Sequence, residues 1–240
     1  MTLLRTLVTL SIPTIVEEVL ATLLQYVDTA MVGQLGEQAT ASVSITTTVT
    51  WLFNSIPGAI GTAVLILISK ADGAGDREQV KKLSHQALFL SVIFGVLLGA
   101  ASVGLSPFVP AWMGAEPAIQ QQASQYYFIV SLPMVFRCAS TILGAALRAI
   151  QDTRTPMLIS VAANGLNIIL NSLLIYAAGL GVAGAAIASA ISYTLSGILM
   201  FVSFRKKAQF SWKWKSFSVE KGLLKECFTV GAPVLGTSLV

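Results

Sequence analysis

Charged residues are scarce in this sequence: Asp, Glu, Lys and Arg make up 11% of its 240 residues, whereas soluble domains average about a quarter. Cysteine is rare too. Cys138 and Cys227 lie in or beside apolar stretches, so they offer neither a disulfide framework nor a metal-ligand spacing. Hydrophobic residues, in contrast, reach 55% and the mean hydropathy is +0.77. This composition excludes a soluble fold and a zinc or redox centre, and it indicates a protein of the lipid bilayer.

Long uncharged windows locate the membrane spans, because a charge at the bilayer centre costs a few kcal/mol and a span needs about 20 apolar residues. Four windows contain no Asp, Glu, Lys or Arg: 38–69, 86–115, 117–136 and 155–204. The last holds two spans, with the break expected at residues 178–181, where two glycines allow a tight reversal. With a further helix at about 5–32, the sequence predicts an all-α polytopic membrane protein with six transmembrane helices.

The distribution of Lys and Arg tests this topology independently. Basic residues occur before the first helix and in every second loop, whereas the loops at 33–40, 107–121 and 179–184 contain none. By the positive-inside rule we expect a cell (inner) membrane protein with a cytoplasmic N-terminus. The net charge of +4 comes from residues that flank apolar runs, not from a basic stripe with aromatics, so we expect the lipid bilayer and no nucleic acid as partner.

An internal similarity suggests a duplicated protein. Residues 4–13 align with residues 224–233 without a gap, and one Leu, one Thr and one Pro are identical: Leu4 with Leu224, Thr9 with Thr229 and Pro13 with Pro233. An even number of helices returns the chain to the same side, so the repeats would be parallel. We therefore expect a six-helix N-terminal transmembrane lobe (1–206), a cytoplasmic interfacial linker (207–222) and the start of helix 7 (223–240). The partner would be the protein's own C-terminal lobe.

One ionisable residue, Asp28, is expected in the outer half of the first helix, and such residues are functional candidates by default. Asn167 and Asn171 lie one helical turn apart at a similar depth, as does Ser189 on the sixth helix. Their oxygens are hard ligands that suit a small alkali cation, so Na⁺ at Asp28, Asn167 and Asn171, or a proton at Asp28, is the expected coupling ion. The alternatives are an interfacial carboxylate at the outer headgroups, and amides and hydroxyls that only join helices.

Two acidic residues of the first helix suggest a buried ion pair. Glu17 and Glu18 lie about as deep as Arg137 of the fourth helix when counted from the basic flanks. A staple between these helices is the expected role, with a proton or substrate role for Glu17 as the alternative. Pro13 lacks an amide donor and permits a bend in the first helix.

The sequence resembles a known family, the multidrug and toxic compound extrusion (MATE) transporters. The resemblance covers essentially the whole chain and is carried by Ser11-Ile12-Pro13, the run Val27-Asp28-Thr29-Ala30-Met31-Val32-Gly33-Gln34-Leu35-Gly36, the run Leu147-Arg148-Ala149-Ile150-Gln151-Asp152-Thr153-Arg154-Thr155-Pro156, the Asn167–Asn171 stretch, and Gly181-Val182-Ala183-Gly184. It implies twelve helices in two lobes, outward-facing and inward-facing states, and cation-coupled export of amphipathic, often cationic compounds.

Residue roles follow from the resemblance. It implies that Asp28 binds Na⁺ or a proton, that Asn167 and Ser189 assist it, that Ala185 gives a backbone carbonyl, and that Pro13 bends the first helix. Several family members carry a second aspartate where this chain has Asn171, so the sequence departs from the family in one charge.

The predicted function is therefore secondary active export of small amphipathic compounds by Na⁺ or H⁺ antiport through alternating access. No enzymatic activity and no cofactor are expected, because no nucleotide-binding loop is present. Two alternatives stay open. One is a flippase for lipid-linked sugars or lipids, which would line its cavity with several cationic residues. The other is an inactive half-transporter or membrane scaffold.

Overall fold

A computed structural model describes residues 3–207 and residue 229. Within these residues the chain is helical and contains no strand. The elements are α1 (Leu3–Gly33), α2 (Glu37–Gly73), α3 (Arg77–Leu105), α4 (Val109–Trp112), α5 (Pro117–Ser131), α6 (Met134–Ala149), α7 (Arg154–Asn171), the π-helix η1 (Ser172–Ala177) and α8 (Gly181–Lys206). This order confirms the all-α prediction. The predicted fourth span, 117–136, consists of α5 and the start of α6, and it continues to Ala149.

Local sequence signals explain where the helices begin and end. The Asp76 side chain caps α3 by accepting a hydrogen bond from the Gln79 amide at 2.9 Å. Pro117 occupies the first turn of α5, where a missing amide proton is tolerated. Between η1 and α8, Gly179 and Gly181 have φ values of +66° and +55°, a region that side chains disfavour. The break predicted at 178–181 therefore lies where expected.

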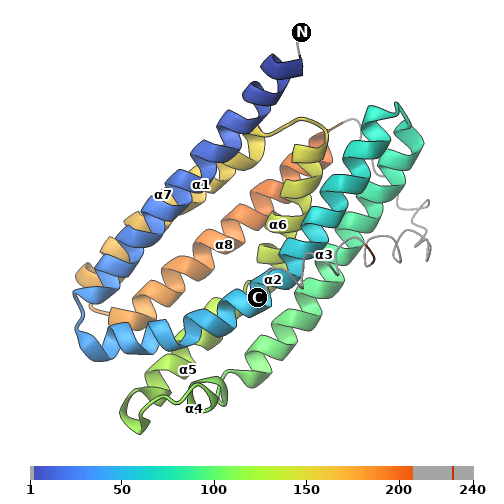
Figure 1. Ribbon diagram of the computed structural model, residues 1–240. Helices are drawn as coiled ribbons and strands as arrows, with labels where there is room; N and C mark the ends of the chain where they lie inside the picture. Colours follow the sequence, from blue (N-terminus) through green and yellow to red (C-terminus); the bar gives the residue numbers. More distant parts are fainter. Residues whose placement is uncertain (1–2, 208–228, 230–240) are drawn as a thin grey trace.

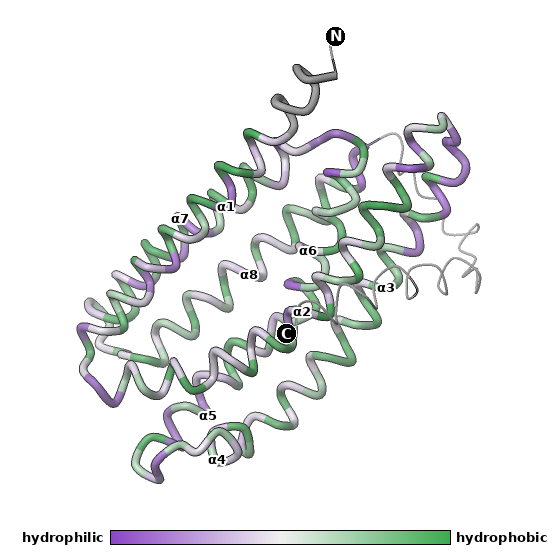
Figure 2. The backbone as a smooth tube through the Cα atoms, viewed as in Figure 1, coloured by the Kyte–Doolittle hydropathy of each residue, from purple (hydrophilic) through white to green (hydrophobic). Residues whose placement is uncertain are grey.

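The helices form a bundle whose connections gather at two ends (Figure 1). The N-terminus, the α2–α3 turn and the α6–α7 connection share one end, and the α1–α2 turn, α4 and the η1–α8 turn share the other. Helix α1 lies beside α7, whereas α6 packs against α2, α3 and α8. Hydrophilic residues concentrate at the turns (Figure 2), as expected for helices that cross an apolar layer.

Membrane spans can be identified in the described part of the chain by helix length and composition. Four helices qualify, namely α2, α3, α7 together with η1, and α8. The pair α5 and α6, bent by 49° at a short break, brings the number to five. Helix α1 is not among the helices identified in this way within the described residues. Only 22% to 44% of each qualifying window is buried, so much apolar surface is left to face lipid or another lobe.

Close backbone approach holds the centre of the bundle together. A Cβ atom on Gly197 of α8 would lie 2.5 Å from the Phe136 carbonyl oxygen of α6, so only glycine permits this crossing. Small residues at crossings are the usual basis of helix association in membranes, where burial of apolar surface gives no driving force. Around this crossing, α6 contributes fully buried side chains that pack against α2, α3 and α8: Ile142, Leu143, Ala146 and Leu147.

The predicted linker and the start of helix 7 lie outside the described residues, apart from Lys207 and Thr229. The division of the chain at these boundaries stays a prediction.

Candidate functional site

A cavity of about 530 Å³ lies among α1, α2, α5, α6, α7 and α8. This volume is in the range of sites for drug-sized ligands. The lining is mostly polar or aromatic, although the bundle around it is apolar. Its polar and aromatic members are Gln25, Asp28, Thr29, Thr46, Thr47, Thr50, Trp51, Asn54, Tyr126, Arg137, Ser140, Thr141, Ser160, Asn164, Asn167, Ser189, Ser192, Tyr193 and Ser196.

Asp28 is the single Asp or Glu among the lining residues, and it is linked to α7 by a hydrogen bond. The Asn171 Nδ2 group donates to Asp28 Oδ1, and the same group lies 3.1 Å from its second acceptor, Asn167 Oδ1. Asn167 Nδ2 in turn donates to Ser189 Oγ at 3.3 Å. The predicted residues Asp28, Asn167, Asn171 and Ser189 thus form one hydrogen-bonded chain across α1, α7 and α8.

The packing of the helices explains why this chain forms. Asn167 and Asn171 are four residues apart and therefore lie on one face of α7. Helix α1 lies beside α7 (Figure 1), and the hydrogen bond from Asn171 to Asp28 joins the two helices. Asn171 is completely buried, and its Oδ1 atom has no hydrogen-bond partner within residues 3–207. A buried acceptor without a partner is costly, so this oxygen is a candidate ligand atom, although it is Nδ2 and not Oδ1 that faces Asp28.

The donor set fits a small monovalent cation. It offers the Asp28 carboxylate and the Asn171 amide oxygen, which are hard oxygen ligands. The described residues contain no group of three or more His, Cys, Asp or Glu side chains that would hold a metal ion of the zinc type. Bound Na⁺ at Asp28, Asn167 and Asn171 stays a prediction.

Ala185 lies one turn before Ser189 on α8 and is buried against Val32 and Ile175. The packing places it beside the hydrogen-bonded chain, and the role of its carbonyl as a ligand stays a prediction. Pro13 lies within α1, which is continuous through it. A bend at Pro13 likewise stays a prediction.

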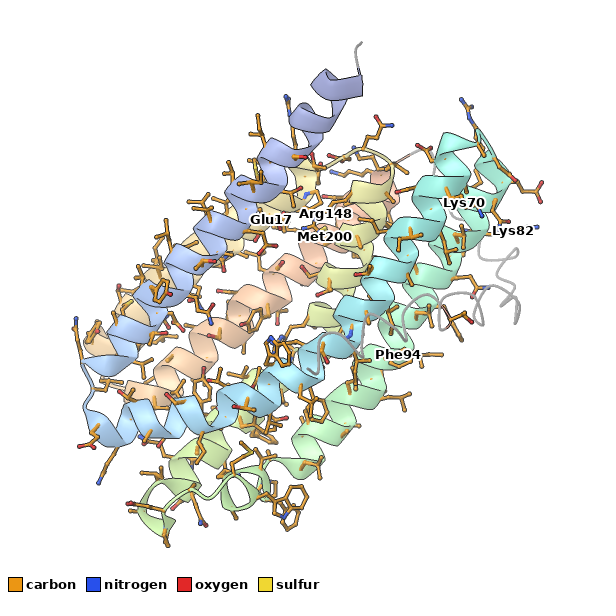
Figure 3. The ribbon with its side chains drawn as sticks, viewed as in Figure 1. Glu17, Lys70, Lys82, Phe94, Arg148 and Met200 are labelled. Carbon is orange, nitrogen blue, oxygen red and sulfur yellow. The ribbon has the colours of Figure 1, made fainter. Side chains whose placement is uncertain are left out.

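Glu17 forms an ion pair with Arg148 and not with Arg137, the partner expected from the sequence. Arg148 Nη2 lies 2.8 Å from Glu17 Oε1 and 2.9 Å from Oε2, and Figure 3 shows the two side chains facing each other. Arg137, the predicted partner, instead lines the cavity, while Glu18 is exposed. Figure 1 shows the start of α1 extending past the start of α7, so counting depth from Arg5 placed Glu17 too deep.

Several cavity residues were not predicted. Thr46, Thr47 and Thr50 of α2 line it, and their hydroxyls donate to backbone carbonyls at 2.8, 3.2 and 2.9 Å. Each hydroxyl oxygen keeps an acceptor lone pair for a ligand. Their spacing at helical intervals within an apolar window was the available signal.

The π-helix η1 was also missed. It follows Asn171 directly, and the Tyr176 hydroxyl lies 2.9 Å from the Met31 carbonyl and 3.0 Å from Gln34 Oε1, two acceptors near the end of α1. Segments of π-helix are frequent at functional sites. This one ties the end of α7 to α1 beside Asp28, and apolar sequence alone gives no sign of it.

A bundle of apolar helices around a polar cavity, with a hydrogen-bonded carboxylate in its lining, is the arrangement expected of a membrane transporter lobe. The comparisons with known proteins agree. The family model MatE matches residues 13–173, about two thirds of the chain. The chain therefore belongs to the MatE family of multi-pass membrane transporters.

Individual relatives show the same relationship. The chain is 29% identical to the "Probable multidrug resistance protein NorM" of Thermotoga maritima, over 95% of this chain and 50% of the relative. It is 31% identical to the FAD transporter of Shewanella oneidensis, over 84% of this chain and 46% of the relative. A solved outward-facing multidrug resistance MATE transporter of the MOP superfamily superposes with a TM-score of 0.91 at 25% identity, over 98% of this chain and 52% of that one. The chain thus spans about half the length of these relatives.

Proposed function

We propose that the full-length protein is a secondary transporter that exports amphipathic small molecules in exchange for Na⁺ or H⁺ through alternating access. The observation that carries this proposal is the hydrogen bond that Asp28, a residue of the cavity lining, accepts from the buried Asn171 amide. A carboxylate within a membrane bundle requires a counter-charge or a proton, because the ionised form is poorly solvated there. Asp28 thus has a reason to bind the coupling ion.

Competition for Asp28 gives the exchange its mechanism. One carboxylate neutralises one unit of positive charge, so either the coupling ion or a positively charged part of the substrate occupies it. Coupling-ion entry from outside then displaces substrate, and ion release inside readies the site for the next substrate. The names of the Thermotoga and solved-structure relatives support export of drugs.

The rival functions have less support. A flippase for lipid-linked sugars would need several cationic groups to hold its phosphates, and Arg137 is the single Lys or Arg among the lining residues. An inactive half-transporter or scaffold would need no polar cavity. The positive-inside distribution supports a cytoplasmic N-terminus in the cell membrane.

The test is dye efflux from proteoliposomes that contain the full-length protein. Wild type and Asp28→Asn are compared under an imposed Na⁺ gradient and, separately, under a pH gradient. We expect one gradient to drive export by wild type, and we expect the variant to lose that response while it keeps its fold. Equal gradient-driven export by both proteins would contradict the role of Asp28, and no response of either protein to either gradient would favour the scaffold.

A further inference from the structure

Arg137 is a basic residue whose charge the described chain does not pair. It lies on α6 and lines the cavity, and its guanidinium carbon is 4.4 Å from the centre of the Tyr193 ring on α8. Within residues 3–207, Arg137 makes no ion pair and no hydrogen bond. A guanidinium within a membrane bundle is costly without an acceptor, so an unpaired one is a candidate ligand group.

The stacking on Tyr193 orients this group without using its donors. A cation–π contact engages the face of the guanidinium, whereas its five N–H donors lie in the plane. The donors therefore stay free for a ligand. A planar fork of this kind matches a carboxylate, which accepts two parallel hydrogen bonds.

A second polar group next to Tyr193 also lacks a partner. The Ser192 hydroxyl lines the cavity, is 96% buried, and has no hydrogen-bond partner in the described part of the chain. One turn further along α8, Ser196 pairs with Ser140 of α6 at 2.8 Å. The crossing of α6 and α8 thus brings hydroxyl groups to the wall that carries Arg137, and a hydroxyl can donate to an anion.

The described lining of the cavity carries one charge of each sign. Asp28 supplies one negative charge and Arg137 one positive charge, and among the described residues no other Asp, Glu, Lys or Arg lines the cavity. Three aromatic residues also line the cavity, namely Trp51, Tyr126 and Tyr193. A ligand that matches both charges and the rings is an aromatic zwitterion.

We propose that Arg137, assisted by Ser192, is the anion-binding subsite of this cavity, and that the preferred substrates are aromatic compounds with a carboxylate, above all zwitterions. The proposal rests on the proposed transport function, because it names the substrate class of the same cavity. The carboxylate binds Arg137 while the cationic part of the same molecule competes for Asp28. Purely cationic compounds leave Arg137 without a counter-charge and bind more weakly.

A matched pair of dyes tests this inference. A rhodamine with a free carboxylate is zwitterionic, and its methyl ester is a cation of nearly the same shape. Fluorescence anisotropy with the purified full-length protein, without any ion gradient, measures both dissociation constants. We expect wild type to bind the acid more tightly than the ester. Arg137→Gln should weaken acid binding about tenfold or more and should not weaken ester binding, because a hydrogen bond to a charged group is lost for the acid alone.

Arg205 offers a matched control for the variant. Its guanidinium lies 5.8 Å from the Phe201 ring, so Arg205→Gln also removes an arginine above an aromatic ring, but Arg205 does not line the cavity. This control should leave both affinities unchanged. Arg137→Lys keeps the charge and loses the planar fork, so we expect an acid affinity between those of wild type and Arg137→Gln.

The outcomes separate this inference from the transport proposal. Arg137→Gln refutes the subsite if it weakens the binding of acid and ester equally, or if it weakens the binding of neither. Arg137 would then be a packing residue, even if Asp28-dependent export is observed. If the acid alone is weakened while neither gradient drives export, the subsite stands and the coupling mechanism is refuted.

Discussion

Arg148 donates from a single nitrogen, Nη2, to both carboxylate oxygens of Glu17, and so joins the last turn of α6 to α1. The Glu17 side chain is 10% exposed and that of Arg148 is 26% exposed. The pair lies at the end of the bundle that carries Lys70 and Lys82 (Figure 3). A pair this well shielded from solvent fixes the position of α1 relative to the centre of the lobe.

Removal of one partner should therefore destabilise the protein. Glu17→Gln or Arg148→Gln alone leaves a poorly solvated charge, and we expect each to lower the free energy of unfolding by about 3 kcal/mol. The double variant should lose less than the sum of the two, because neither charge remains. Unfolding by SDS titration in mixed micelles measures all four proteins.

An exposed pair provides the control. Lys82 and Glu78 on α3 are 3.3 Å apart, with side chains 43% and 81% exposed. Their coupling energy in the same experiment should stay below about 0.5 kcal/mol, because solvent screens the pair. A coupling between Glu17 and Arg148 as small as this would contradict the structural role.

Asn171 gives a prediction about coupling. Its amide bonds both Asp28 and Asn167, so Asn171→Ala removes a hydrogen bond to a carboxylate. We expect the concentration of coupling ion needed for half-maximal transport to rise about tenfold, in line with the loss of a charge-assisted hydrogen bond. Transport by proteoliposomes over a series of ion concentrations measures this.

Asn164 is the matched control for that variant. It lies on the same helix and lines the cavity, but its Nδ2 atom contacts Ser160 Oγ at 3.5 Å and not Asp28. Asn164→Ala should change the half-maximal ion concentration by less than about twofold. Equal effects of the two variants would mean that the ion responds to the polarity of the cavity and not to the bond at Asp28.

Asp152 in the α6–α7 connection gives a pH dependence. Burial raises the pKa of Asp152, but hydrogen bonds from Lys207 and Thr155 and the Lys207 charge outweigh it and hold the pKa below its ordinary value of 3.8. Lys207 Nζ lies 2.6 Å from Asp152 Oδ2, and the Thr155 amide lies 3.1 Å from Oδ1. The carboxylate thus accepts hydrogen bonds from Thr155 in the first turn of α7 and pairs with Lys207 at the end of α8.

The sign of the effect follows from the lowered pKa. The ionised form is favoured in the folded state, so its contribution is fully present above the ordinary pKa of 3.8 and is lost as the pH falls through the folded value. At neutral pH, Asp152→Asn should be less stable than wild type by about 1 kcal/mol, and the two should converge as the pH falls through the folded pKa of Asp152. Unfolding curves over a pH series test this, and a constant difference across the series would contradict it.

The sequence predicted where the helices lie and which polar residues gather near Asp28, but it predicted few of the contacts between side chains of different helices. Uncharged windows identified the spans, because a long apolar run has few alternatives to a membrane helix. The three-and-four spacing put Asn167 and Asn171 on one face of α7, and the hydrogen-bonded chain from Asp28 to Ser189 contains the residues expected there. The bend between α5 and α6 and the π-helix η1 carry no comparable pattern and were not predicted.

Composition and local spacing by themselves determined the class of protein, its all-α fold, the turn at 178–181 and the candidate status of Asp28, because these depend on how each segment interacts with lipid and with itself. Only the tertiary structure decided that Glu17 pairs with Arg148 and that Arg137 stacks on Tyr193. The physical reason is that sequence gives an approximate depth along a helix, whereas a contact also depends on rotation about its axis, on bends and on where the helix begins. Those quantities are set by packing against neighbours that are distant in the sequence.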